Sequence, residues 1–176
     1  ALDITGYSGV YDGAAHSITV SGLITGDTIS YSLDGSIWTA EKPEFTNVTT
    51  GTAVYVRVTN PNYEDRNGSG TVTITPAPVT ITVNDGSKVY GASDPAFSGI
   101  VNGLIGSDSI GTVSYSRTGT DENVGTYPDV LTASYTANSN YTVTVNNGDF
   151  AITPATGAAL DITGYSGVYD GAAHSI

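Results

Sequence analysis

Residues 52–58 read Thr52-Ala53-Val54-Tyr55-Val56-Arg57-Val58, with a valine at every second position. A period of two places alternate side chains on opposite faces of a β-strand, so these valines should line a core. The same alternation recurs over residues 71–74, 79–83 and 141–145, and no window of similar length keeps a helical period. The sequence therefore predicts an all-β fold.

Short pairs of residues that tolerate positive φ separate the predicted strands. Such pairs favour tight turns. They are Asp12-Gly13, Asp34-Gly35, Asn67-Gly68, Asp85-Gly86 and Asn147-Gly148. Their spacing predicts many short strands, as in a small β-sandwich.

An exact internal repeat sets the organisation of the chain. Residues 1–18 recur without a change as residues 159–176, at an offset of 158 residues. Either the parent gene carries near-identical units of this length, or the second copy was added by engineering. The first explanation is simpler, because nothing else in the chain resembles a tag or fusion scar.

A fainter repeat divides the 158-residue unit. Thr73-Ile74-Thr75-Pro76-Ala77 matches Ala151-Ile152-Thr153-Pro154-Ala155 at an offset of 78 residues. We therefore expect two related Ig-like β-sandwich modules in an extended array. Module A should span residues 1–77 and module B residues 78–156, while residues 157–176 form a linker and the start of the next module A.

Composition limits the partners of this chain. It has 176 residues, no cysteine, and 17 acidic against five basic side chains, which gives a net charge of −12. Nucleic acids and anionic membrane surfaces attract cationic proteins, so neither is an expected partner. No signal peptide or apolar run of 18 residues is present, so we expect export and anchoring signals elsewhere in the parent chain.

Several phrases resemble repeats of bacterial surface proteins. In module A these are Val10-Tyr11-Asp12-Gly13, Asn60-Pro61-Asn62-Tyr63 and Ile74-Thr75-Pro76-Ala77, which resemble YDG-type repeats. In module B they are Lys88-Val89-Tyr90-Gly91-Ala92-Ser93-Asp94-Pro95, Val101-Asn102-Gly103-Leu104 and Glu122-Asn123-Val124-Gly125-Thr126-Tyr127, which resemble MBG-type repeats. The resemblance implies long arrays in secreted or surface-attached proteins, an extracellular location, and a spacer or adhesive role without catalytic residues.

Candidate catalytic and metal-binding residues are few. His16 is the single histidine of the 158-residue unit, and without cysteine it cannot build a usual zinc site. Its neighbour Ser17 points to the opposite strand face, so no local nucleophilic pair forms and we expect no enzyme. Calcium is the one candidate cofactor, with Asp27, Asp108, Asp121 and Glu122 as its ligands. No Asp-x-Asp-x-Asp-Gly loop is present, so solvated acids that keep the array soluble are the favoured alternative.

Two further residues have alternative interpretations. Lys88 could form an isopeptide bond with an asparagine inside an apolar core, but an exposed lysine that discourages edge pairing is favoured. Trp38 could stack on a sugar ring if it is exposed, although a lone tryptophan in a small sandwich is more often part of the core.

The predicted function is that of a structural repeat unit of a large bacterial surface or secreted protein. It would serve as a stalk or spacer in adhesion, or as a building block of a filament. The alternative is an adhesive module that binds a surface glycan or protein. Expected partners are neighbouring repeats, and strand exchange through residues 1–18 or 159–176 is a further option. Membrane insertion is not expected.

Overall fold

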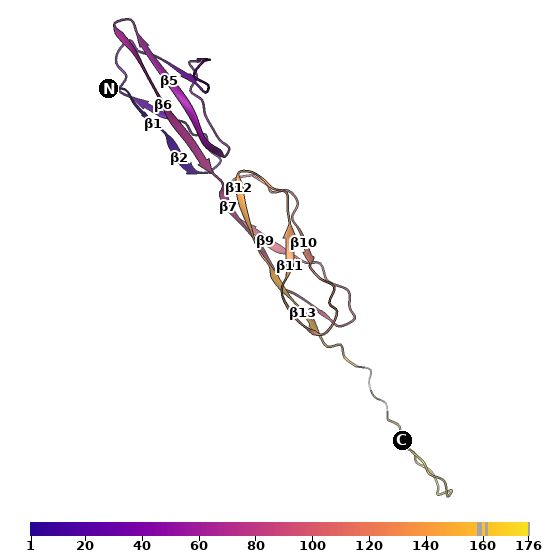
Figure 1. Ribbon diagram of the computed structural model, residues 1–176. Helices are drawn as coiled ribbons and strands as arrows, with labels where there is room; N and C mark the ends of the chain where they lie inside the picture. Colours follow the sequence, from indigo (N-terminus) through magenta and orange to yellow (C-terminus); the bar gives the residue numbers. More distant parts are fainter. Residues whose placement is uncertain (158–159, 161, 176) are drawn as a thin grey trace.

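The computed structural model describes residues 1–157, 160 and 162–175, and all of the regular structure in these ranges is β-strand. The predicted all-β class is confirmed. No described segment forms a helix of the length and apolarity needed to cross a membrane. Figure 1 shows two elongated groups of strands that follow one another along a common direction.

The first unit holds strands β1 to β6 in two sheets. Sheet order is β2-β6-β5-β4 in the larger sheet and β1-β3 in the smaller one. The strands are β1 (Asp3–Thr5), β2 (Tyr7–Val10), β3 (Thr19–Ser21), β4 (Thr28–Ser32), β5 (Thr49–Asn60) and β6 (Tyr63–Thr75).

The second unit holds strands β7 to β13, also in two sheets. Their orders are β10-β11-β13-β8 and β12-β7-β9. The strands are β7 (Ala77–Val83), β8 (Gly86–Val89), β9 (Gly99–Asn102), β10 (Ser114–Arg117), β11 (Gly125–Ser134), β12 (Tyr141–Asn146) and β13 (Gly148–Thr153).

Alternating burial along β5 confirms the interpretation of the opening motif. Val54, Val56 and Val58 are fully buried, whereas Tyr55 on the opposite face is exposed. Because each apolar residue removed from water stabilises the fold, the valine stripe fixes which face of β5 turns inward.

A second cluster fills the space between the two sheets of the second unit. It joins Val83 of β7 to Leu131 of β11 and to Phe150 and Ile152 of β13. Phe97 meets the Phe150 ring edge to face, with centroids 5.7 Å apart. Side chains from facing sheets thus form one layer of core, as in a sandwich.

The two units repeat the same strand pairing. In the first, β2 runs parallel to β6 and β1 antiparallel to β3; in the second, β8 runs parallel to β13 and β7 antiparallel to β9. One difference is that β6 is continuous, whereas its counterpart is divided into β12 and β13, and β12 pairs in parallel with β7. The exact boundaries at residues 77 and 156 remain predictions.

The repeated C-terminal segment keeps local contacts of its first copy. The rings of Tyr165 and His174 stack at 3.6 Å, as those of Tyr7 and His16 do at 3.9 Å. His16 therefore has a packing role in the first unit. Residues 158, 159, 161 and 176 of the predicted linker and next module lie outside the described residues.

Candidate functional site

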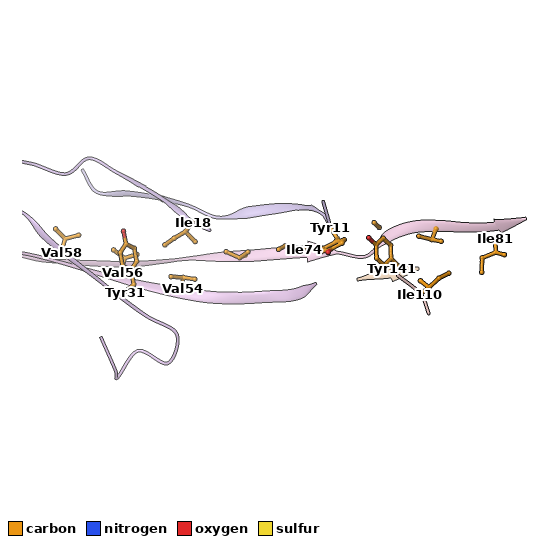
Figure 2. Close-up of a cluster of buried hydrophobic side chains, with 13 residues drawn as sticks. Tyr11, Ile18, Tyr31, Val54, Val56, Val58, Ile74, Ile81, Ile110 and Tyr141 are labelled. Atoms are coloured by element: carbon orange, nitrogen blue, oxygen red, sulfur yellow. The ribbon is translucent and has the colours of Figure 1, made fainter. Parts of the chain in front are cut away.

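The junction between the two units is a packed interface. Tyr11, which follows β2, meets Tyr141 at the start of β12 edge to face, with ring centroids 5.4 Å apart. Both tyrosines are buried, with 6% and 7% of their surface exposed. Figure 2 shows one line of buried side chains running from Val58 in the first unit to Ile81 in the second. The core thus continues across the junction.

Asp108 ties the two tyrosines together. Its Oδ2 atom accepts hydrogen bonds from the hydroxyl of Tyr141 at 2.6 Å and from that of Tyr11 at 2.7 Å. These two bonds hold the pKa of Asp108 below its usual value, and the bond to Asp108 raises the pKa of Tyr11. Burial is the main cause of the raised pKa of Tyr141. Asp108 is therefore ionised and the tyrosines are protonated at neutral pH.

Asn140 forms the second polar contact across the junction. Its Oδ1 atom accepts a bond from the Val48 backbone N–H at 3.0 Å, and its Nδ2 atom donates to Asn47 Oδ1 at 2.9 Å. The backbone carbonyl of Asn140 also accepts from the Ala77 N–H at 2.9 Å. Asn140, a residue of the second unit, thus makes hydrogen bonds to the first unit and to the connecting strand β7.

This combination restricts motion between the units. Two domains joined by a linker move freely unless an apolar, well-paired interface holds them. Here the interface has buried rings, a shared apolar core and hydrogen bonds from two side chains, Asp108 and Asn140. We conclude that the two units form a stiff pair.

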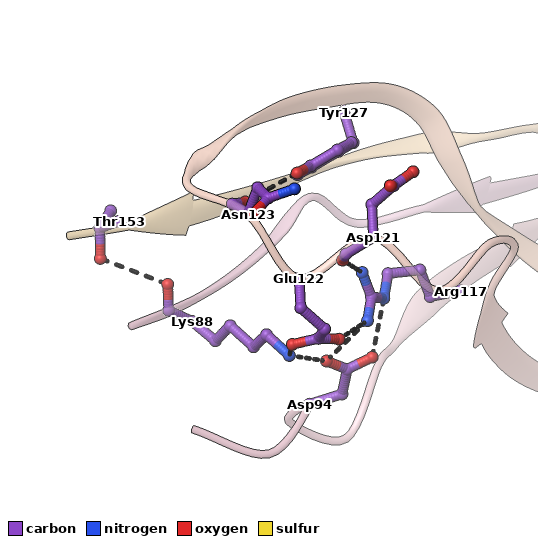
Figure 3. A network of polar contacts seen from close by, with 8 residues as sticks. All are labelled: Lys88, Asp94, Arg117, Asp121, Glu122, Asn123, Tyr127 and Thr153. Carbon is purple, nitrogen blue, oxygen red and sulfur yellow. Dashed lines mark hydrogen bonds and ion pairs between the residues drawn. The ribbon is translucent and has the colours of Figure 1, made fainter. Parts of the chain in front are cut away.

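A second polar cluster lies toward the other end of the second unit (Figure 3). Lys88 on β8 donates to Asp94 Oδ1 at 2.8 Å and is also paired with Glu122. Arg117 on β10 donates from Nε to Asp94 Oδ2 at 2.8 Å and from a terminal nitrogen to Glu122 at 2.5 Å. Two cations and two carboxylates therefore form a closed ring of ion pairs.

The ion-pair ring corrects the interpretation of Lys88. Its side chain is only 4% exposed, so it is not an exposed edge lysine. Lys88 lowers the pKa of Asp94 and of Glu122, and the same carboxylates raise the pKa of Lys88. The predicted isopeptide bond with an asparagine has no asparagine partner here, because the side chains that contact the Lys88 amine are those of Asp94 and Glu122. The contacts fit a structural ion-pair network that fastens the loop before β11 to β8.

The four predicted calcium ligands lie in three places. Asp27 accepts from the Ile24 N–H at 2.8 Å and is paired with Arg66. Asp108 is at the junction, while Glu122 is in the ion-pair ring and Asp121 precedes it in the same loop. Among the described residues, no group of three or more His, Cys, Asp or Glu side chains gathers as a metal site. The calcium site stays a prediction.

Trp38 is half-buried, and the guanidinium of Arg57 lies over its ring at 4.6 Å. A pocket of about 300 Å³ opens beside this region. It is lined by Tyr31, Ser32, Leu33, Asp34, Ile37, Thr39 and Pro43, and Trp38 is not among them. The predicted sugar contact at Trp38 therefore stays a prediction, and the exposed side chains of Leu33 and Ile37 are the apolar groups of this surface.

Of the residues in contact at the junction, the sequence singles out only Asp108, as a calcium ligand, although the others also carry a signal. Asn140-Tyr141 matches Asn62-Tyr63, and Gly103-Leu104-Ile105 matches Gly22-Leu23-Ile24 in the other unit. Residues repeated at the same loop positions of both units indicate a shared role, and one copy of these loops lies at the junction. The sequence alone did not show which of the repeated loops lie at the same end.

The fold and the junction define a class of protein: tandem β-repeat chains whose units are joined end to end. Residues 79–151 match the family model described as MBG domain (YGX type). This module family is non-catalytic, and its tandem repeat domains are typical of bacterial surface proteins. The predicted MBG resemblance of the second unit is thereby confirmed, while the YDG resemblance of the first unit lies outside the matched residues.

Two further comparisons concern curated proteins and solved structures. No curated protein matches it. The chain is similar to a solved structure of the N-terminal eight Ig domains of Down Syndrome Cell Adhesion Molecule isoform 1.30.30, at 10% identity and a TM-score of 0.30. The match covers 86% of this chain and 25% of the other, so the chain spans about a quarter of that protein's length in the structure.

Proposed function

We propose that this chain is a structural repeat unit of a large bacterial surface or secreted protein, acting as a stalk or spacer in adhesion or as a filament building block. The observation that carries the proposal is the continuous core across the junction. A spacer must hold its length, and a buried, hydrogen-bonded junction supplies the stiffness that this requires.

Charge and repetition support the same role. The net charge of −12 makes neighbouring units repel and keeps an array soluble and extended. The reappearance of residues 1–18 at 159–176 supports a parent chain in which such units follow one another. In this proposal the units span residues 1–77 and 78–156, the protein is extracellular, and it has no catalytic role of its own.

An array-length experiment tests the spacer role. Arrays of one, two and four 158-residue units would be displayed on a bacterial surface with an epitope at the tip. We expect the height of the epitope above the cell surface, measured by super-resolution microscopy, to rise in proportion to unit number. A flexible linker of equal residue count is the control, and its height should rise only as about the square root of its length. Equal heights for the two series would contradict the proposal.

A binding role is the second candidate, favoured by the pocket beside Trp38 and the exposed Ile37 on its wall. Such pockets combine apolar walls with a few polar groups, which Ser32 and Asp34 provide here. A glycan panel and host-protein extracts would be titrated while the fluorescence of Trp38 is followed. Saturable change in the wild type, abolished by Ile37→Asp and kept by Ile100→Asp in the other unit, would support binding.

A further inference from the structure

Apolar side chains are exposed at the two outer ends of the pair of units. At the far end of the first unit, Leu23, Ile24 and Tyr63 are exposed, and a groove of about 440 Å³ lies beside Ile24 and Tyr63. At the far end of the second unit, Val89, Tyr90 and Val124 are exposed. We call the first set the head surface and the second set the tail surface.

The tail surface has the same backbone geometry as the end of the first unit that is buried in the junction. Tyr11 N–H donates to the Thr75 carbonyl at 2.8 Å, and Tyr90 N–H donates to the Thr153 carbonyl at 2.8 Å. Asn47-Val48, which contact Asn140 in the junction, match Asn123-Val124 in the second unit. The tail surface is thus a second copy of a surface known to dock.

The head surface likewise repeats the docked end of the second unit. The Asp27 N–H bonds the Ile24 carbonyl at 3.1 Å, and the Asp108 N–H bonds the Ile105 carbonyl at 3.0 Å. The Asn62 N–H bonds Asn60 Oδ1 at 3.0 Å, and the equivalent bond at Asn140 has the same length. The loops that receive the first unit are therefore also present, with their turns formed, on the free head.

The tyrosines of the junction are buried, whereas their counterparts at the two outer ends are exposed. Tyr11 and Tyr141 are buried in the junction, whereas their counterparts Tyr90 and Tyr63 are 52% and 62% exposed. Since burying a large aromatic ring removes much apolar surface from water, the two free rings favour a partner that covers both.

We propose that the tail surface docks on the head surface of the next copy of the repeat, as the first unit docks on the second. Asn62 of the next copy accepts from the Val124 N–H and donates to Asn123, while Tyr90 packs against Ile24 and Tyr63 of that copy. This inference rests on the proposed role in an array and adds the contact that joins one 158-residue repeat to the next.

The connecting segment is long enough for this docking. From Thr75 to Tyr90 the chain crosses the junction, and from Thr153 to Tyr169 it is one residue longer. Tyr169 occupies the place of Tyr11 in the next copy. The linker itself is longer between repeats: one residue, Pro76, separates β6 from β7, whereas residues 154–160 separate β13 from the position of β1 in the next copy.

The polar contacts around the aspartate differ between the two junctions. Asp108 receives two tyrosine hydroxyls, whereas Asp27 is already paired with Arg66 and accepts from the Ile24 N–H. The Tyr90 hydroxyl therefore meets an ion pair in place of a free carboxylate. The asparagine contacts and the apolar packing are the features that the two junctions share.

Pulsed electron resonance on a longer chain tests the docking. A full second copy of residues 1–158 would replace the partial one. Spin labels would be attached through Ser116→Cys and Ser69→Cys, and they would react only at these positions because the chain has no cysteine of its own. Labels at 69 and 116 of one copy span the known junction. Labels at 116 of the first copy and 69 of the second span the proposed one.

The expected result is a narrow distance distribution for both label pairs. Tyr90→Ala in the first copy with Asn62→Ala in the second should widen the cross-copy distribution roughly twofold, because an undocked linker lets the repeats move. The exposed control Tyr55→Ala should change neither. A cross-copy distribution that is broad in the unmodified chain, or unchanged by the two substitutions, overturns the docking. If the within-copy pair stays narrow in that case, the stiff unit and its spacer role stand.

Discussion

Replacing Phe150 by alanine tests whether the second unit can unfold while the first unit stays folded. Phe150 is fully buried, meets Phe97 edge to face, and lies 4.9 Å from the guanidinium carbon of Arg117. Truncating a buried phenylalanine leaves a cavity and costs about 3–5 kcal/mol, and we expect about 4 kcal/mol here. A unit of roughly 80 residues has about 4–12 kcal/mol of stability in total. The second unit should therefore become marginal.

The chain contains its own reporter for the first unit. Trp38 is the single tryptophan and belongs to the first unit, whereas far-ultraviolet circular dichroism reports the strands of both. In urea, Phe150→Ala should move the dichroism transition of the second unit by about 4 kcal/mol. The Trp38 transition should move much less, by the loss of the junction alone.

A control and two outcomes make this test decisive. Ile100→Ala removes an exposed side chain from β9 of the same unit and should cost at most about 0.5 kcal/mol. An equal shift of the Trp38 and dichroism transitions for Phe150→Ala would show that the two units unfold as one cooperative body and would refute their independent unfolding. A shift under about 1 kcal/mol in both would refute the assignment of Phe150 as a core residue.

Three further predictions follow from the polar contacts and the turns. Asp108→Asn should widen the within-copy label distribution, because an amide is a weaker acceptor for two tyrosine hydroxyls than a carboxylate. Folding stability should fall in acid, because the pKa of Glu122 is lower in the folded than in the unfolded chain, so its ion pair with Lys88 stabilises the fold above the unfolded pKa and stops doing so as pH falls through the folded pKa. A Lys88→Met chain should therefore lose less free energy of unfolding between pH 6 and 3, measured by urea unfolding at each pH. An equal loss in the two chains would refute the role of the pair. Gly103→Ala should destabilise the fold by about 1 kcal/mol or more, because φ at this residue is +101° and the new Cβ would lie 2.5 Å from the Pro78 carbonyl oxygen. Gly157→Ala is the control, because the space around Gly157 is open, and it should leave the thermal midpoint unchanged. Equal thermal midpoints for the two variants would contradict this prediction.

Local patterns were enough to predict the strands. The valines of residues 52–58 alternate because one face of β5 is buried, and the structure buries the predicted face. The match between Thr73-Ile74-Thr75 and Ala151-Ile152-Thr153 likewise reflects two units with the same pairing of their last strands. These features depend on near neighbours in the sequence, so a single chain reveals them.

The polar sites depend on distant residues, and the sequence did not reveal them. The sequence favours an exposed edge lysine at Lys88; β8 is an edge strand, but nothing within it shows that Asp94 and Glu122 cover the amine. Tyr11 and Asp108 are far apart in the chain and meet only because the two units dock. A useful signal was present: with five basic residues among so many acids, a cation inside a strand is expected to have a carboxylate partner.

The parallel pairing of the second strand with the last strand in each unit has a consequence for tension. β2 beside β6, and β8 beside β13, run in the same direction, so the chain enters one strand and leaves the other at opposite poles of the pair. When the two ends are pulled apart, the hydrogen bonds between these strands are loaded in shear and share the load, whereas a hairpin pulled from its open end unzips one bond at a time. In a surface tether built from such units, all hydrogen bonds of a strand pair would together resist the pulling force of fluid flow.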